Sequence, residues 1–170
     1  TSLLSVYFAV AMSAVILSKS VNAQPITLDG PECHPESSDK TPCWMRDKVS
    51  GCYVWNPFPR KGESVRWSGN CVAGFSEGEG ETIWYINEQR SQRSLTLDRR
   101  GKSHGCGRLE WANGTIYEGA LRNSVFEGYG HLRAAGGEEY VGMFSAGKMH
   151  GMGRMTTLNG LQVLEGQWDM

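Results

Sequence analysis

The sequence predicts an all-β protein: an elongated antiparallel sheet, or solenoid, of stacked β-hairpins with a disulfide-stapled N-terminal cap. Three observations support this prediction. From Trp67 onward the chain repeats a glycine-containing pattern about every 23 residues. Within each copy, apolar and polar residues alternate with the period of a β-strand. Finally, four cysteines lie close together around the start of the repeats.

The repeats are clearest when the copies are aligned on a Gly-x-Gly pair. Their starts lie at Trp67, Ser94, Tyr117, Tyr140 and Leu164, which gives offsets of 27, 23, 23 and 24 residues. The copy at Ser94 lacks both the aromatic start and the first glycine, so an unpaired or irregular strand is expected around Glu88 to Asp98. The last copy is interrupted at Met170, and we expect the native chain to continue.

Aromatic residues recur at equivalent positions of these copies. Residues two positions apart in a strand share a face, so equivalent positions form rows across the sheet. The aromatic members of these rows are Trp67, Trp84, Trp111, Tyr117, Tyr140, Phe144 and Trp168. One hairpin cannot bury its apolar face alone, so neighbouring hairpins must stack. We interpret these rings as packing between hairpins, with an aromatic ligand-binding surface as the alternative.

This pattern resembles that of the MORN-repeat family, which reads Y-x-G-x-W, a glycine-containing turn, H-G-x-G and a short strand. In this chain it is carried best by Tyr140-Val141-Gly142-Met143-Phe144 and His150-Gly151-Met152-Gly153. The resemblance covers residues 67–170, although Cys71 replaces the aromatic residue of the first copy. It implies protein–protein scaffolding and, in some members, contact with membrane lipid.

The first 23 residues differ from the rest. Residues 3–17 carry no charge, and Val21-Asn22-Ala23 places small apolar residues where a signal peptidase reads them. We therefore expect a signal peptide cleaved after Ala23 and an exported protein, whether periplasmic, cell-surface or secreted. A membrane anchor through residues 3–17 is the alternative, although a bilayer span needs about 20 residues.

The cysteines all follow the expected cleavage site. In an oxidising compartment, cysteines clustered near a mature N-terminus usually form disulfides. The preferred pairing is Cys33–Cys43 and Cys52–Cys71, with Cys106 as a free thiol, while four cysteines allow three connectivities. The expected organisation is a signal peptide at 1–23, a cysteine- and aromatic-rich cap at 24–66, and hairpin repeats at 67–170.

No residue pattern here predicts catalysis, a cofactor or a metal site. His104 and His150 occupy the same repeat position two copies apart, so they should be separated by roughly 19 Å and cannot share a metal. There is no G-x-S-x-G nucleophile motif. Each Gly-x-Gly pair leads into a strand, whereas a phosphate loop needs a following helix. The protein is therefore not expected to be an enzyme.

The expected function is a non-catalytic, exported binding or scaffolding module. Its formal net charge of −1 gives no basis for nucleic-acid binding. A protein partner is expected, with a membrane lipid or a glycan as alternatives. One local basic cluster, interpreted as solvated or as a lipid or partner contact, comprises Arg90, Arg93, Arg99, Arg100 and Lys102. Another alternative is that the repeats target an enzyme whose catalytic domain lies beyond residue 170.

Overall fold

The computed structural model describes residues 26–157 and 163–169, which form strands and turns without a helix. The predicted all-β architecture is thereby confirmed. The strands are β1 (Cys43–Arg46), β2 (Tyr53–Asn56), β3 (Glu63–Trp67), β4 (Asn70–Val72), β5 (Phe75–Ile86), β6 (Gln89–Arg99), β7 (Lys102–Trp111), β8 (Ile116–Arg122), β9 (Val125–Arg133), β10 (Glu139–Ser145), β11 (Lys148–Thr156) and β12 (Val163–Asp169). The expected signal peptide or anchor at residues 1–23 lies outside the described residues. In the described part, no helix is long and apolar enough for a membrane span.

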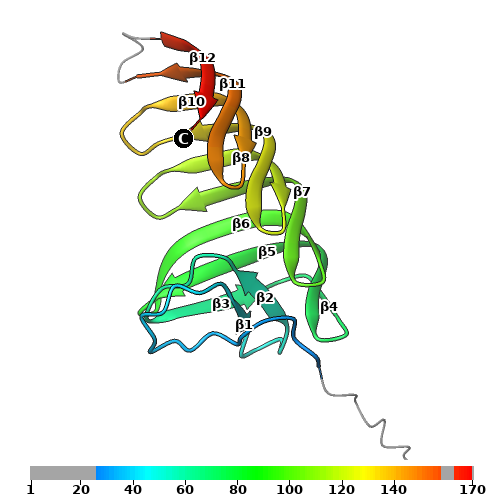
Figure 1. The fold of residues 1–170 in the computed structure, drawn as a ribbon. Coiled ribbons are helices and arrows are strands. Elements are labelled where there is room, and N and C mark those ends of the chain that lie inside the picture. The colour runs from blue at the N-terminus through cyan, green and yellow to red at the C-terminus, as the bar shows by residue number, and fades with distance from the viewer. Residues whose placement is uncertain (1–25, 158–162, 170) are drawn as a thin grey trace, which may run out of the picture.

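All twelve strands belong to one open sheet. From β5 to β12 each strand pairs antiparallel with its neighbour in sequence, so the hairpins stack one above another along an elongated array (Figure 1). At the N-terminal end β3 and β4 pair in succession with β5, and β2 meets β5 through one parallel pair, Tyr53 with Phe75. The cap strands β1 and β2 therefore lie against the first repeat.

Strand β6 is paired on both sides, so of the unpaired or irregular strand expected around Glu88 to Asp98 only the irregularity is found. It pairs with β5 from Gln89 to Asp98 and with β7 from Gln92 to Arg99. Sheet pairing uses backbone N–H and C=O groups, which the degenerate copy supplies as well as any other. Its irregularity is limited to one register shift against each neighbour.

The Gly-x-Gly pairs of β7, β9 and β11 each lie at a bulge of their strand. Between β8 and β9 the register moves from Gly119↔Gly130 to Leu121↔Phe126, so β9 gains two residues over β8 in this step. Gly128, within the bulge, has a φ of +92°, a left-handed conformation that glycine adopts without steric cost. The hairpins β6–β7 and β10–β11 show the same step. Because a bulge bends its strand, this recurring glycine pair curls the sheet.

The aromatic residue that opens a regular copy lies over the second glycine of the pair. A Cβ built on Gly130 would lie 2.7 Å from Cε2 of Tyr117, so a side chain larger than hydrogen has no room there. The Tyr140 ring covers Gly153 and the Trp67 ring covers Gly80 in the same way. The repeat pattern thus reflects a contact between an aromatic ring on one strand and a glycine on the strand paired with it.

The polar tip of each of these rings is hydrogen-bonded to the carbonyl three residues further along the chain. Tyr117 Oη donates to Ala120 O at 2.8 Å and Tyr140 Oη donates to Met143 O at 3.0 Å. In the first copy, Trp67 Nε1 donates to Asn70 O at 2.8 Å. These carbonyls lie where the bulge interrupts the sheet pairing, which explains why the position holds Tyr or Trp, whose buried polar tips need a partner.

The repeat core lies on one face of the sheet, which we call the inner face. Its central cluster comprises Leu109, Tyr117, Leu121, Tyr140 and Phe144. Tyr117 is 0% exposed, and its ring stacks on Phe126 with centroids 3.7 Å apart. Burial, with a smaller contribution from Cys106, raises the pKa of Tyr117 to about 12. Successive hairpins therefore share one apolar surface that none could bury alone.

The cap is joined to the first repeat by covalent and polar links. The disulfides are Cys33–Cys43, within the cap, and Cys52–Cys71, which connects the cap to β4. The buried Asp47 carboxylate accepts a hydrogen bond from the Trp67 N–H at 3.1 Å. Burial opposes its ionisation, but donors that include Ser50 Oγ and this N–H hold the pKa of Asp47 below its ordinary value.

Candidate functional site

The opposite, outer face carries a ladder of ion pairs across the sheet. Arg108 on β7 lies between Glu110, at 2.8 Å, and Glu118 on β8. The further pairs are Arg93 with Glu81 and Glu110, Arg133 with Glu139, and Arg154 with Glu165. Exposed pairs of this kind contribute little to stability. In each of these pairs a glutamate offsets the positive charge of the arginine.

Next to this ladder runs an exposed apolar strip, which we call the outer stripe: Cys106, Ala120, Tyr129, Met143 and Met152. The register places Cys106 opposite Ala120 and Met143 opposite Tyr129, so the stripe follows adjacent strands from β7 to β11. Tyr129 is 63% exposed and Met152 is 68% exposed. Both residues are the middle residue of a Gly-x-Gly triplet, and their large side chains are exposed to water. Cys106, which holds that position in β7, is a free, exposed cysteine.

The inner face holds the aromatic residues singled out from the sequence, and the structure divides them into two groups. The buried group comprises Trp67, Trp84, Tyr117, Tyr140 and Phe144, all less than 10% exposed. Trp111 and Trp168 are partly buried and pack at the edge of the repeat core. Trp67 and Trp84 belong to a separate cluster with cap residues, among them Met45 and Val54. The buried rings are packing residues, and one of them, Trp84, also lines a pocket together with Trp111.

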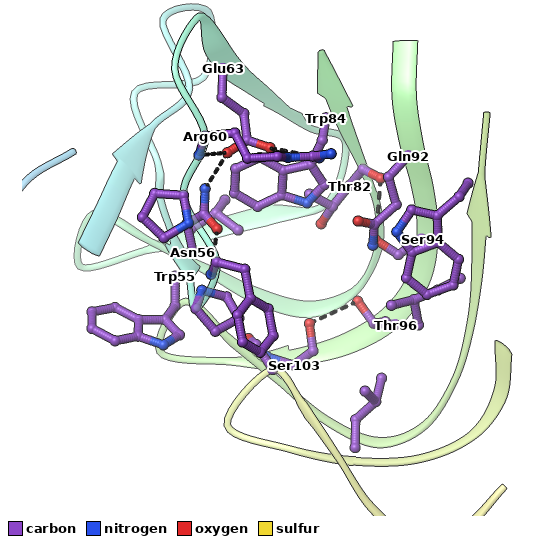
Figure 2. A pocket seen from close by; sticks show the side chains of 18 of the residues that line it. Trp55, Asn56, Arg60, Glu63, Thr82, Trp84, Gln92, Ser94, Thr96 and Ser103 are labelled. Atoms are coloured by element: carbon purple, nitrogen blue, oxygen red, sulfur yellow. Dashed lines mark hydrogen bonds and ion pairs between the residues drawn. The ribbon is translucent and has the colours of Figure 1, made fainter. Parts of the chain in front are cut away.

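That pocket, with a volume of about 440 Å³, opens on the inner face at the degenerate copy (Figure 2). Its floor includes Ser94 and Thr96 of β6 and Thr82 of β5. Ser94 stands where Tyr117 and Tyr140 open the next two copies, and Thr96 stands where those copies have Gly119 and Gly142. The row of rings is therefore interrupted here, and hydroxyl groups occupy the position of a buried phenol.

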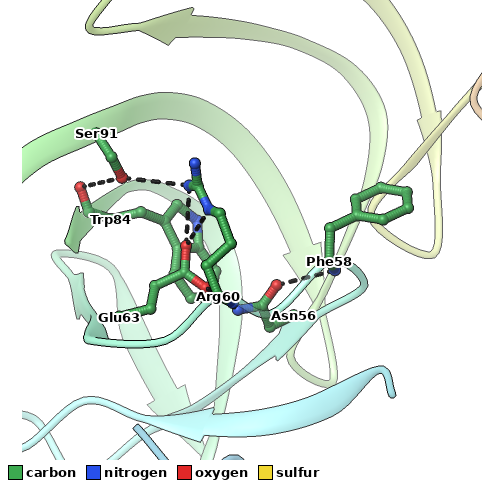
Figure 3. A network of polar contacts seen from close by, with 6 residues as sticks. All are labelled: Asn56, Phe58, Arg60, Glu63, Trp84 and Ser91. Carbon is green, nitrogen blue, oxygen red and sulfur yellow. Dashed lines mark hydrogen bonds and ion pairs between the residues drawn. The ribbon is translucent and has the colours of Figure 1, made fainter. Parts of the chain in front are cut away.

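A loop of the cap, residues 57–62, forms one wall of the pocket. Glu63 accepts hydrogen bonds from Asn56 Nδ2 at 2.7 Å and from the Arg60 N–H at 3.0 Å, and its other oxygen pairs with the Arg60 guanidinium. Arg60 also donates to Ser91 Oγ of β6 at 3.4 Å, and Ser91 Oγ donates to Trp84 O at 3.1 Å (Figure 3). These contacts hold the loop across the end of the β5–β6 hairpin.

The basic cluster noted in the sequence does not form a single patch. Arg93 lies in the outer ion-pair ladder. Lys102 Nζ instead lies 4.7 Å from the ring centroid of Trp55 and 3.5 Å from an Asp29 oxygen. Arg100 is placed over the Phe75 ring. Arg93, Arg100 and Lys102 are therefore held by separate partners.

The described residues also contain no group of three or more His, Cys, Asp or Glu side chains placed to hold a metal ion. His104 lies on β7 and His150 on β11, with three strands between them.

Sequence reasoning overlooked two features of this arrangement. The outer stripe is not predicted, because the repeat pattern is defined by its glycines and the residue between them varies. The pocket floor is not predicted, because a copy without its aromatic residue and first glycine indicates only an irregular repeat. The sequence nevertheless carries a signal for the pocket. A copy that has Ser94 and Thr96 in place of the aromatic residue and the glycine must either leave a space on the inner face or fill it with other side chains.

Fold and surfaces together define a β-hairpin repeat protein. Comparison with protein families identifies its repeats: residues 99–116, 117–138 and 140–162 each match the MORN repeat. The chain therefore contains MORN repeats, as its sequence pattern implied. MORN repeats are generally non-catalytic modules that bind proteins or membrane lipids.

The chain is also similar to Alsin from Rattus norvegicus and from Homo sapiens. In each case the identity is 39% over 82 residues, which is 44% of this chain and 5% of Alsin. The chain thus matches only a small part of these relatives, and the likeness lies in the repeats.

Proposed function

We propose that this chain is an exported, non-catalytic binding module that holds a protein partner against the outer stripe. The observation that carries the proposal is the exposure of Tyr129, Met143 and Met152 on one continuous face. Tyrosine and methionine are enriched in protein interfaces, and methionine adapts its shape to a partner. Across the five strands β7 to β11 the stripe is about 19 Å long, enough for a short segment of a partner.

Charge favours a protein over a membrane surface as this partner. Recognition of anionic lipid uses clusters of Lys and Arg, but the arginines beside the stripe are paired with glutamates. A partner with an apolar strip flanked by charges of both signs would match this face. Export is supported by the two disulfides, because such bridges persist mainly in oxidising compartments.

The exposed thiol of Cys106 allows a direct test, because it lies within the stripe. The disulfide-bonded chain would be labelled at Cys106 with a benzophenone maleimide and irradiated in an extract of the export compartment. We expect a discrete crosslinked adduct that excess unlabelled wild-type chain suppresses. Excess Tyr129→Ser/Met152→Ser chain should not suppress it, whereas Val49→Ser, which changes an exposed apolar residue of the cap, should compete like wild type.

Competition by Tyr129→Ser/Met152→Ser at the wild-type level would contradict the proposal. The proposal would also be contradicted if Cys106→Ser protein, treated with the same reagent, gave the same crosslinked adducts. Vesicles of neutral and anionic lipid, added as separate competitors, report on the lipid alternative: suppression by anionic vesicles alone would favour lipid.

A second candidate is that the repeats serve as the targeting part of a larger protein. The observation that favours it is that the matched region makes up only 5% of Alsin. The complete reading frame tests it, since this candidate requires a further folded domain outside residues 1–170.

A further inference from the structure

The inner-face pocket has the features of a ligand site that the proposed partner surface does not use. It lies on the face opposite the outer stripe, between the degenerate copy and the cap loop (Figure 2). Its volume of about 440 Å³ falls within the range of small-ligand sites. Ligand binding in the pocket and partner binding on the outer stripe can therefore be tested separately.

Tryptophan side chains border the pocket on β5 and β7, the two strands that flank β6. The register places Trp84 on β5 opposite Gln92 on β6, and Gln92 opposite Trp111 on β7. Two strand spacings put the Cα atoms of Trp84 and Trp111 about 10 Å apart, with both side chains on the inner face. Phe58 of the cap loop, 69% exposed, lies at the same pocket. Aromatic groups thus stand around a polar floor.

One hydroxyl in the floor lacks a hydrogen-bond partner. Thr82 is 3% exposed, and its Oγ1 is buried without a partner. Leaving a buried hydroxyl unpaired costs free energy, which a ligand able to bond it would recover. The neighbouring Ser94 hydroxyl makes one long bond, to Thr82 O at 3.4 Å. Hydroxyl groups can both donate and accept, and the Gln92 carboxamide adds both capacities at the same place.

The charges around the pocket favour an uncharged ligand. Arg60 and Glu63, both in the lining, neutralise each other at 3.0 Å. The remaining charged lining residue, Lys40, lies at the exposed surface. A lipid chain would contact the apolar lining residues Leu109, Leu121 and Phe126, but it would leave the Thr82 hydroxyl without a partner. A ligand that combines apolar C–H faces with several neutral hydroxyls suits both the aromatic walls and the floor.

We propose that this pocket binds a neutral sugar unit of a glycan. The sugar ring stacks its C–H face on the tryptophan walls, while its hydroxyls bond Thr82, Ser94 and Gln92. The indole faces carry partial negative charge and attract the partly positive C–H groups. In the degenerate copy, Ser94 replaces the aromatic residue of the regular copies and so leaves space for the sugar ring. Its hydroxyl then serves as a hydrogen-bond partner for the sugar.

Isothermal titration of the disulfide-bonded chain with a panel of neutral oligosaccharides tests this proposal, with tryptophan fluorescence as a second readout. The panel contains β-1,4-glucose, α-1,4-glucose and N-acetylglucosamine oligomers, together with a proline-rich peptide. We expect saturable binding of at least one sugar and a change in tryptophan emission on binding. The variant Ser94→Tyr/Thr96→Gly, which restores the ring and glycine of the regular copies, should abolish that binding.

Two further variants keep the test interpretable. Leu95→Tyr adds the same ring one position away on the outer face, where Leu95 is 43% exposed, and should bind like wild type. Thr82→Val removes the unpartnered hydroxyl with little change in volume, so it should weaken sugar binding and raise the unfolding temperature. Circular dichroism checks that each variant is folded.

Absence of binding to every sugar in the panel overturns the proposal. It is also overturned if sugar binding persists in the folded Ser94→Tyr/Thr96→Gly variant, because the sugar would then lie elsewhere. Binding of the proline-rich peptide in place of any sugar, with loss in the same variant, would assign the pocket to a peptide. None of these results depends on the Cys106 crosslinking, which reports on the opposite face.

Discussion

Replacing Tyr140 by alanine should lower the free energy of unfolding by about 3–5 kcal/mol, as expected for truncating a large buried aromatic residue. Tyr140 is 1% exposed, and its ring meets Phe144 and Trp168 with centroid separations of 5.2 and 5.7 Å. Its hydroxyl also donates to Met143 O at 3.0 Å. The substitution therefore opens a cavity between two hairpins and removes the hydrogen-bond donor of a carbonyl at the bulge.

The same substitution at Tyr129 provides a matched control. Tyr129 lies in the adjacent strand β9, but it is 63% exposed on the outer face. Tyr129→Ala should change the unfolding free energy by less than about 0.5 kcal/mol, the usual range for surface positions. Urea unfolding followed by circular dichroism measures both variants. Equal losses for the two tyrosines would show that the two faces are not packed differently.

Loss of the Cys52–Cys71 bridge should destabilise the chain by about 3 kcal/mol in the chain-entropy model, because the bridge closes a segment of 19 residues. Cys52 is 0% exposed and precedes β2, whereas Cys71 lies in β4. The bridge therefore links the cap to the first repeat, and its loss frees the cap from that hairpin. The variant to use is Cys52→Ala/Cys71→Ala.

Calorimetry with and without reductant measures this effect. Cys106→Ala should unfold like the wild type, since its exposed thiol forms no bridge. Reductant should lower the unfolding temperature of the wild-type chain at least to that of the double variant, because it also opens Cys33–Cys43. A double variant as stable as wild type, with Cys33–Cys43 intact, would mean that the cap is held by its noncovalent contacts alone.

Much of the fold follows from the sequence because each copy shows the residue alternation of a β-strand and recurs at a regular spacing. Alternation of apolar and polar residues predicts which face each residue occupies, and the equal spacing of copies predicts that hairpins stack. Tyr117 and Tyr140 hold equivalent positions of successive copies, so both are predicted on the same face of the sheet, and both are buried. The positive φ of Gly128 and the close approach of Gly130 to Tyr117 explain why the pair recurs as glycine.

The candidate sites were less accessible to sequence reasoning, because they depend on contacts between distant segments. The pocket requires the cap loop, which Arg60 and Glu63 fix near Ser91, some 30 residues away in sequence. Of the two states expected for β6, the unpaired one is wrong, because backbone pairing does not depend on the missing aromatic residue, and the irregular one agrees with its register shifts. The outer stripe follows from periodicity, but its exposure depends on what packs against it, and periodicity does not report that.

The central claim is that each regular copy places its opening ring over a glycine of the neighbouring strand, so that adjacent hairpins seal one apolar surface. Nuclear Overhauser contacts of glycine α-protons test this claim most directly. We predict cross-strand contacts from the Tyr117 ring to Gly130 and from the Tyr140 ring to Gly153, with those α-protons shifted upfield by the ring currents. Ordinary glycine shifts and no ring-to-glycine contacts across either strand pair would contradict it.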